Sequence, residues 1–220
     1  ASLKDEQLNA MFMTLNRNLI EQQKNRIKEY YKGSIFKPLS WNTFDIESYI
    51  EELCVILNIQ WKKLDYRLFE QSFRTEKIRS LKLPYLNDVR RKTIPSLWLE
   101  YNTNYINIDG KKRTTAEYSA GRSKLFGTND DDDETEARMA FADYCESQFE
   151  RYQSIPEISG TILEKILEIE TLGTREEKER LQTLKSDILI LDEVQDLTAP
   201  IISLLLVMHR GPLNSIMICG

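Results

Sequence analysis

Two adjacent acids near the end of the chain, Asp192 and Glu193, form the pattern with the clearest chemical meaning. They follow four aliphatic residues, Ile188 to Leu191. An unbroken aliphatic run predicts a strand covered on both faces, as in a parallel sheet. The two acids then lie just past the carboxyl end of that strand, where open α/β sheets bind ligands. In a nucleotide site the first acid can hold Mg²⁺, and the second can orient or deprotonate an attacking water.

The same string also fits a buried strand that ends in a solvated acidic turn. A longer pattern favours the chemical interpretation, because Val194, Gln195 and Asp196 follow the two acids. Asp-Glu-x-Gln-Asp after an aliphatic strand resembles motif II, the Walker B motif, of the UvrD/Rep-like superfamily 1 helicases. All four defining positions of that motif match.

The resemblance implies a role for each residue of the motif. Asp192 would hold Mg²⁺, and Glu193 would activate water for attack on the γ-phosphate of ATP. Gln195 would sense the nucleotide or link it to the nucleic-acid site, and Asp196 would support the nucleotide-binding motif through polar contacts. For Gln195 and Asp196 the alternative is simple capping of a helix predicted over residues 198–209.

A second segment lies near the start of the chain. Residues 10–15 are apolar and predict a strand, residues 16–18 form a polar turn, and apolar residues at helical spacing follow up to Gly33. The segment from Phe12 to Leu19 resembles motif Ia of the same helicases. That resemblance implies contact between the backbone of a single strand and Thr14, Asn16 and Arg17. Leu15 stands where the family usually has an aromatic residue.

Taken together, these segments predict an α/β fold. We expect an incomplete RecA-like (P-loop NTPase) parallel sheet built from residues 1–33 and 186–220. Residues 34–185 would form a large, mainly helical insertion, in the place of the family's 1B-type accessory region. Within it, Asp45 precedes a helical pattern over residues 46–57 and Thr114 precedes a helix start, so both are predicted helix N-caps. Several stretches of this insertion follow an order found in the eukaryotic branch typified by the TPR and ankyrin repeat-containing protein.

The family's Walker A loop is not in this sequence, which has no Gly-x-x-x-x-Gly-Lys-Ser/Thr. We therefore expect a fragment that runs from motif Ia to just before motif III. Alone it should not hydrolyse ATP, because half of the phosphate site is missing. The remainder of the helicase chain is thus an expected partner.

Charge is distributed unevenly along the 220 residues. Residues 1–113 hold 20 Lys/Arg and 14 Asp/Glu, a balance of +6, and residues 114–220 hold 10 and 21, a balance of −11. Cations alternate with aromatic residues over residues 61–113, a pattern that suits single-stranded nucleic acid. With the helicase resemblance, we expect single-stranded nucleic acid as a partner, with DNA favoured over RNA. The alternative is that the aromatic residues form a core and the cations a solvated surface.

Other features narrow the range of functions. One histidine and three widely spaced cysteines argue against a histidine triad, a zinc site and a disulfide framework. The acidic run over residues 129–136 lacks the ligand spacing of an EF-hand loop and predicts an acidic loop that leads into a helix. No apolar run approaches the roughly 20 residues of a membrane helix, and the first residues show no signal-peptide pattern. We expect an intracellular protein, in the nucleus or the cytoplasm.

One alternative function belongs to another class of protein. A charged, helical interaction module without catalysis could keep a relict Walker B strand. The two interpretations differ in whether Glu193 takes part in ATP hydrolysis and whether Arg17 contributes to single-strand binding.

Overall fold

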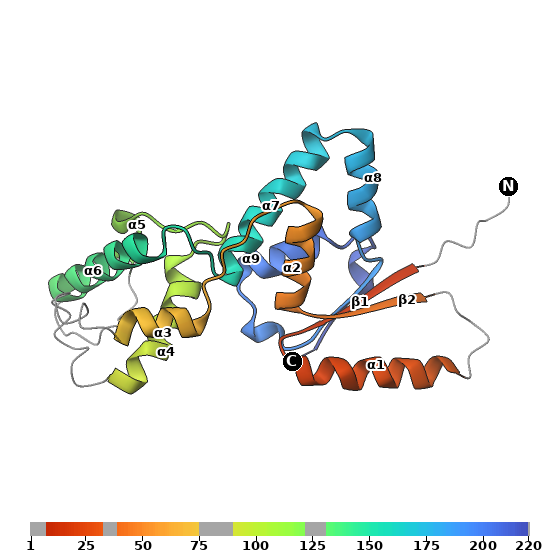
Figure 1. The fold of residues 1–220 in the computed structure, drawn as a ribbon, viewed down its shortest axis with the longest axis horizontal. Helices are drawn as coiled ribbons and strands as arrows, with labels where there is room; N and C mark the ends of the chain where they lie inside the picture. The colour runs from red at the N-terminus through yellow and green to blue at the C-terminus, as the bar shows by residue number, and fades with distance from the viewer. Residues whose placement is uncertain (1–7, 33–38, 75–89, 122–130, 220) are drawn as a thin grey trace. The chain divides into compact units, whose positions relative to one another are not determined.

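The computed structural model describes residues 8–32, 39–74, 90–121 and 131–219 (Figure 1). It is an α/β protein with one four-stranded, all-parallel sheet and mostly helical content elsewhere. The strands are β1 (Leu8–Thr14), β2 (Leu39–Asp45), β3 (Ile188–Leu191) and β4 (Ile216–Ile218). The order across the sheet is β2-β1-β3-β4.

The helices are assigned over the described residues as follows: α1 (Arg17–Lys32), α2 (Ile46–Ile56), α3 (Tyr66–Arg74), α4 (Arg90–Glu100), α5 (Thr115–Ser119), α6 (Asp131–Phe149), α7 (Ile155–Leu172), α8 (Arg175–Leu184) and α9 (Ala199–Val207). A π-helical turn (Tyr101–Tyr105) extends α4. Two 3₁₀ turns, Val194–Asp196 and Leu213–Ser215, follow β3 and precede β4.

The chain divides into two compact units. Unit 1 contains residues 1–60, 161–197 and 201–220, and unit 2 contains residues 61–160 and 198–200. The sheet lies in unit 1. Strand β2 was not predicted, and it lies inside the range 34–185 that the sequence assigned to the helical insertion.

Sequence signals account well for the ends of several elements. The aliphatic run ahead of Asp192 forms β3, and the predicted cap Asp45 begins α2, with its Oδ1 accepting from the Ser48 N–H at 3.0 Å. Thr114 begins α5 with a reciprocal capping box, in which its side chain and that of Glu117 each bond the other's backbone N–H. The predicted cap at residue 114 is therefore confirmed.

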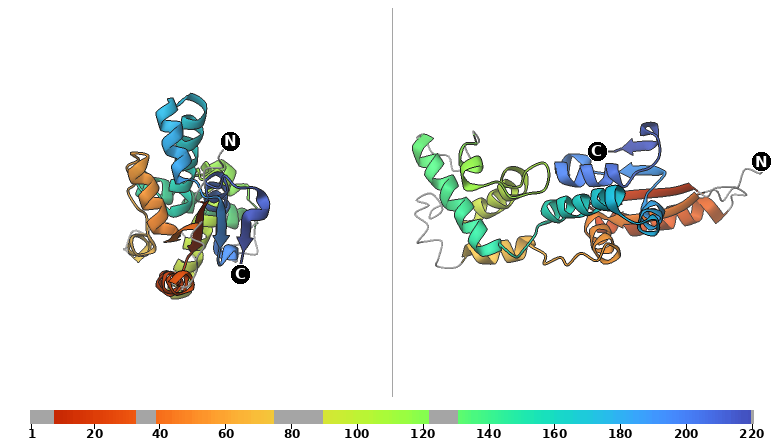
Figure 2. Two further views of the ribbon diagram at one scale, coloured as in Figure 1. Left: turned by 90° about the vertical axis from the view of Figure 1, so that its right-hand side faces the viewer. Right: turned by 90° about the horizontal axis from the view of Figure 1, so that it is seen from above.

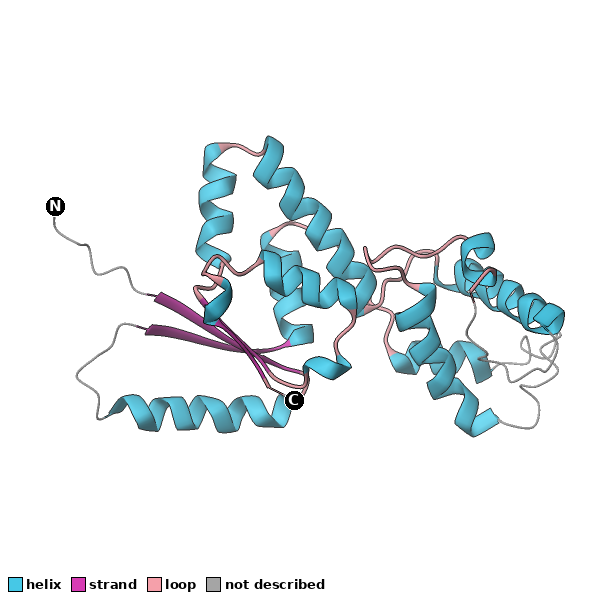
Figure 3. Ribbon diagram, turned by 180° about the vertical axis from the view of Figure 1, so that it is seen from behind, coloured by secondary structure: helices cyan, strands magenta, loops and turns pink. Residues whose placement is uncertain are grey.

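Helices lie on both faces of the sheet. Figures 1 and 2 show α1 beneath β1 and β2, and α2, α8 and α9 on the opposite face. The same arrangement is seen from behind in Figure 3, where the strands form the middle layer. Coverage on both faces explains the continuous apolar character of β3, because its side chains meet helices in either direction.

The amino-terminal edge of the sheet is held by an ion pair. Arg210 donates from Nε and Nη2 to the two carboxylate oxygens of Asp187, at 2.7 and 2.8 Å. The Asn9 N–H also donates to Asp187 Oδ2, at 2.8 Å. This group connects the start of β1 with the residues before β3 and the loop after α9.

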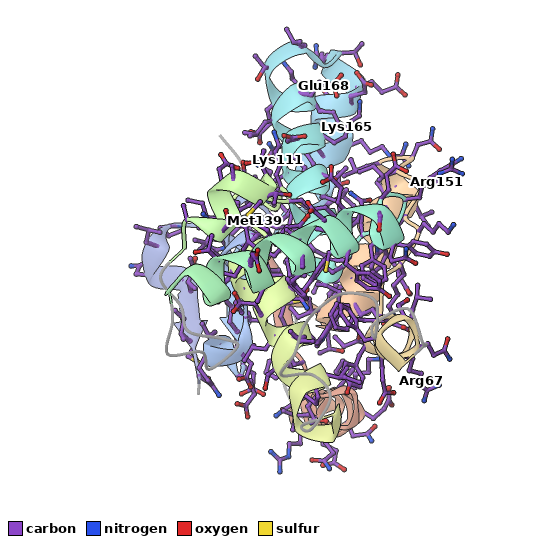
Figure 4. All side chains as sticks on the ribbon, turned by 90° about the vertical axis from the view of Figure 1, so that its left-hand side faces the viewer. Arg67, Lys111, Met139, Arg151, Lys165 and Glu168 are labelled. Carbon is purple, nitrogen blue, oxygen red and sulfur yellow. The ribbon has the colours of Figure 1, made fainter. Side chains whose placement is uncertain are left out.

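Unit 2 is built around an aromatic core. Phe69, Tyr101 and Phe141 are fully buried, and Phe69 lies 5.6 Å from Phe149 between ring centroids. Exposed cations such as Arg67 and Arg151 stand away from the ribbon (Figure 4). The aromatic residues in the described part of 61–113 therefore serve mainly as core, with charges outside.

Two buried acids are satisfied inside unit 2. Glu100 accepts from the Tyr118 hydroxyl at 2.8 Å and lies 3.6 Å from Arg138 Nη2. Glu157 accepts from the Tyr101 hydroxyl at 2.9 Å, and Lys112 Nζ lies 3.5 Å away. Burial raises the pKa of Glu157, and the Lys112 charge opposes that rise.

None of the helices in the described part of the chain is long and apolar enough to cross a membrane.

Asp187→Asn should lower the free energy of unfolding at pH 7 by about 1 kcal/mol, because the pair is partly exposed. The Arg210 hydrogen bonds hold the pKa of Asp187 below its usual range. A depressed folded pKa gives stability that is fully present above the unfolded value of about 4 and is lost as pH falls through the folded value. Denaturant titrations between pH 7 and pH 2 should therefore show the variant's deficit shrinking in acid. The exposed pair Arg175–Glu179 of α8 is the control, and Arg175→Ala should cost less than about 0.5 kcal/mol.

Arg138→Ala should destabilise the protein by about 3–5 kcal/mol, because it leaves Glu100 buried without its cation. The side chains of Arg138 and Glu100 are 2% and 4% exposed. Arg151→Ala, at an exposed position just after α6, should change stability by less than about 0.5 kcal/mol. Equal losses in the two variants, measured by urea unfolding, would contradict a structural role for the buried pair.

Candidate functional site

The sheet changes its winding direction between β1 and β3. From β1 the chain passes through α1, on one face, to the outer strand β2. From β3 it passes through α9, on the other face, to the outer strand β4. Two crossovers that leave a central pair in opposite directions define a topological switch point. Ligands of open α/β sheets bind outside the carboxyl ends of the strands at that point.

Three polar residues meet at this edge because of the strand register. Thr14 is the partner of Asp45 across β1 and β2. Met13 is the partner of Leu191 across β1 and β3, so Thr14 and Asp192 are the next residues on their two chains. The Asp192 N–H donates to Met13 O at 2.9 Å, which continues the ladder one residue past the end of β3.

A hydrogen bond joins the two central chain ends. Thr14 Oγ1 donates to Asp192 Oδ2 at 3.2 Å. The same hydroxyl oxygen accepts from the Asn16 N–H at 3.0 Å. Thr14 is 1% exposed, whereas Asp192 is half-buried. The carboxylate is thus anchored through one oxygen by a group that water does not reach.

Asp45 is the member of this row that the site prediction missed. Its Oδ2 accepts from the Ser48 hydroxyl at 2.7 Å, so both carboxylate oxygens are engaged at the start of α2. Asp45 was predicted as a helix cap, but its place beside Thr14 depends on β2, which was not predicted. Leu39 and Trp41 alternate with polar neighbours, and the strand-favouring pair Thr43 and Phe44 follows, which is the signal that could have indicated this strand.

Glu193 occupies an unusual backbone conformation. Its φ of 56° and ψ of 41° lie in the left-handed region, which non-glycine residues rarely adopt. The chain then turns through Val194–Asp196, with the Asp196 N–H donating to Glu193 O at 3.1 Å. Gln195 Nε2 donates to Glu193 Oε2. The structure therefore brings the carboxylate of Glu193 together with the amide of Gln195.

The remaining predicted residues lie around this centre. Gln195 and Asp196 are exposed in the 3₁₀ turn after β3. Asn16 is exposed between β1 and α1, and its carbonyl accepts from the Leu19 N–H at 3.0 Å. Arg17 is the first residue of α1, and its side chain lies outside those that the structure describes. Thr14 is turned inward to Asp192, whereas Leu15 and Asn16 are exposed.

The donor set limits which cation could bind. In the described ranges, no group of three or more His, Cys, Asp or Glu side chains is arranged to hold a metal ion. Mg²⁺ at nucleotide sites keeps several waters and uses one or two carboxylates together with phosphate oxygens. The half-buried Asp192 can supply one such carboxylate, whereas the described side chains around it do not form a closed cage of protein ligands.

Comparisons of the chain with protein-family models, with curated proteins and with solved structures found no match. The site is therefore interpreted from its own geometry, which consists of two acids after β3, a buried threonine at the end of β1 and a change of winding direction between them.

Glu193→Gly should raise the free energy of unfolding by up to about 1 kcal/mol, because glycine adopts positive φ without the steric cost that Cβ imposes. Glu193→Ala is the matched control, since it removes the same carboxylate and keeps the Cβ. It should give no such gain. Urea unfolding of the three proteins measures the difference. Equal stabilities of the glycine and alanine variants would show that the backbone of Glu193 is not strained.

Proposed function

We propose that this chain is part of the ATPase core of a UvrD/Rep-like superfamily 1 helicase or translocase. The observation that carries the proposal is the position of Asp192 and Glu193 at the carboxyl end of β3, at the switch point of a parallel sheet. The proposal also takes the four-stranded parallel sheet as part of an incomplete RecA-like (P-loop NTPase) fold. Unit 2 would belong to the accessory region of the motor.

The order of the motifs supports the proposal. The strand that ends in the motif Ia-like turn, β1, is hydrogen-bonded to the strand that ends in the Walker B-like acids, β3. Parallel pairing brings both carboxyl ends to one edge of the sheet. A nucleotide bound at Asp192 would therefore lie close to the turn that carries Asn16.

Each residue of the proposed site has a defined task. Bound Mg²⁺ would supply positive charge to the phosphates of ATP. Asp192 would hold that cation through its carboxylate, of which one oxygen is already fixed by Thr14. Glu193 would orient the attacking water and take its proton. Gln195 donates to the Glu193 carboxylate and would hold it in place before water binds.

Single-stranded nucleic acid is the proposed partner of the turn after β1, with DNA favoured over RNA. Asn16 is exposed there, and Arg17 opens a 16-residue helix. Backbone N–H groups at a helix start and an adjacent cation are common partners of phosphate. Asn16 and Arg17 would therefore contact the strand backbone without reading its sequence.

The remainder of the helicase chain is the other proposed partner. Met217 and Ile218 of β4 are 58% and 65% exposed. In the described sheet β4 pairs with β3 on one side. An apolar strand at a sheet edge suits pairing with a further strand. Such a strand from the same polypeptide would extend the sheet beside the proposed nucleotide site, and the P-loop would come from that polypeptide.

The experiment is nucleic-acid-stimulated ATP hydrolysis by the longer polypeptide that joins this chain to a P-loop. Glu193→Gln should lower stimulated turnover by at least about 100-fold, because the amide cannot accept the proton of water. Glu179→Gln, on the exposed surface of α8, is the matched control and should keep the full rate.

Two results would contradict this proposal. Equal turnover by the Glu193→Gln variant and the unmodified protein would remove Glu193 from catalysis. Absence of turnover by the unmodified protein, with and without single strands, would favour the alternative of a non-catalytic interaction module.

A further inference from the structure

The hydroxyl of Thr14 has only one arrangement that satisfies its neighbours. The Asn16 N–H can only donate, so Thr14 Oγ1 accepts from it at 3.0 Å. The single hydroxyl proton is then free for Asp192 Oδ2, 3.2 Å away. An ionised carboxylate can only accept, so the direction of both hydrogen bonds follows from the chemistry of the three groups.

Burial makes this arrangement specific. Thr14 is 1% exposed, so its hydroxyl does not bond to bulk water and is directed to Asp192, while its oxygen accepts from the Asn16 N–H. The backbone on both sides is fixed by the parallel ladder, through the Asp192 N–H to Met13 O bond at 2.9 Å. The orientation of the Asp192 side chain is therefore set mainly by one hydrogen bond from the neighbouring strand.

We propose that Thr14 is a positioning residue, which holds one oxygen of Asp192 so that the other faces the ligand side of the sheet edge and binds a divalent cation. This inference rests on the proposed function, because it takes Asp192 as the cation ligand. It gives Thr14 a task different from the strand contact that the motif Ia resemblance implied. Partners that orient a metal-binding side chain are typically worth about 10- to 100-fold in metal affinity.

Thr14→Val is the decisive variant, because valine has nearly the shape of threonine and lacks the hydroxyl. Thr14→Ser keeps the donor and should restore the unmodified behaviour. Thr43→Val is the matched control, since Thr43 lies on the neighbouring strand β2, two residues before Asp45. Thr14→Ala removes the hydroxyl without adding bulk, and replaces the valine variant if that protein does not fold.

Two NMR measurements on the 220-residue chain test the inference. Three-bond couplings between Hα and Hβ of Asp192 report its side-chain rotamer without any metal. Added Mn²⁺ broadens amide signals close to its binding site, and broadening at Glu193 and Asn16 reports binding at Asp192. Signals near the acidic run at residues 129–136 serve as an internal reference for non-specific binding.

The unmodified chain, Thr14→Ser and Thr43→Val should show one Asp192 rotamer and local broadening by Mn²⁺. Thr14→Val should show averaged couplings, and its broadening at Glu193 and Asn16 should fall about tenfold, toward the level of Asp192→Asn. The broadening near residues 129–136 should be unchanged in all variants.

Two outcomes overturn the inference. Broadening and couplings in Thr14→Val equal to those of the unmodified chain would show that the hydroxyl does not position Asp192, and would leave the proposed ATPase function intact. Broadening in the unmodified chain no greater than in Asp192→Asn would show that Asp192 does not bind the cation. Turnover of the Glu193→Gln variant decides the proposed function separately.

Discussion

The pairing of β1 with β3 is the constraint on which the rest of unit 1 depends. The two strands are separated by more than 170 residues of sequence, yet they form the centre of the sheet in register from Ala10 with Ile188 to Met13 with Leu191. Closing so long a loop is entropically costly, so the pairing must be supported by burial and by contacts at both ends. Coverage of both faces by helices provides the burial.

The two ends of this central pair are held by different chemistry. At the amino end, Asp187 receives hydrogen bonds from Arg210 and from the Asn9 backbone, so its charge is neutralised. At the carboxyl end, Asp192 accepts a hydrogen bond from the neutral hydroxyl of Thr14 and is half-buried. The first end is suited to stability, whereas the second keeps a negative charge accessible to a ligand.

Most of what could be predicted from the sequence came from short, local patterns. The aliphatic run before Asp192 predicted β3, and the caps at Asp45 and Thr114 were predicted because capping depends on residues only three positions apart. Strand β2 was missed because Ser40, Asn42 and Asp45 weaken its apolar character. Its assignment requires β1 beside it, which is long-range information.

The same limit applies to the site. Asp192 and Glu193 could be identified from their place after an apolar strand. The role of Thr14 could not, because it follows from the register between β1 and β3, and no spacing in the sequence encodes that register. The positive φ of Glu193 could not be predicted from the sequence either, since glutamate has no particular preference for the left-handed region.

The aromatic and basic stretch of unit 2 shows why composition alone is a weak guide to nucleic-acid binding. Bases stack on exposed rings, but Phe69, Tyr101 and Tyr105 are at most 2% exposed and pack against one another. The hydroxyl of Tyr101 is used inside the unit by Glu157. The position of these rings is therefore explained by packing. The proposal of a nucleic-acid partner then depends on the turn at Asn16.

The backbone conformation of Glu193 helps to decide between the two functional interpretations, an ATPase site and an interaction module. A solvated acidic turn after a strand has no need of a left-handed glutamate, because glycine or asparagine adopts that conformation at lower cost. Strain in a non-glycine residue persists where the side chain is required at that place, and such residues cluster at functional sites. Here the strained residue directly follows the acid that Thr14 holds at the switch point. This coincidence favours a working acidic pair over a relict strand that serves only as part of an interaction module.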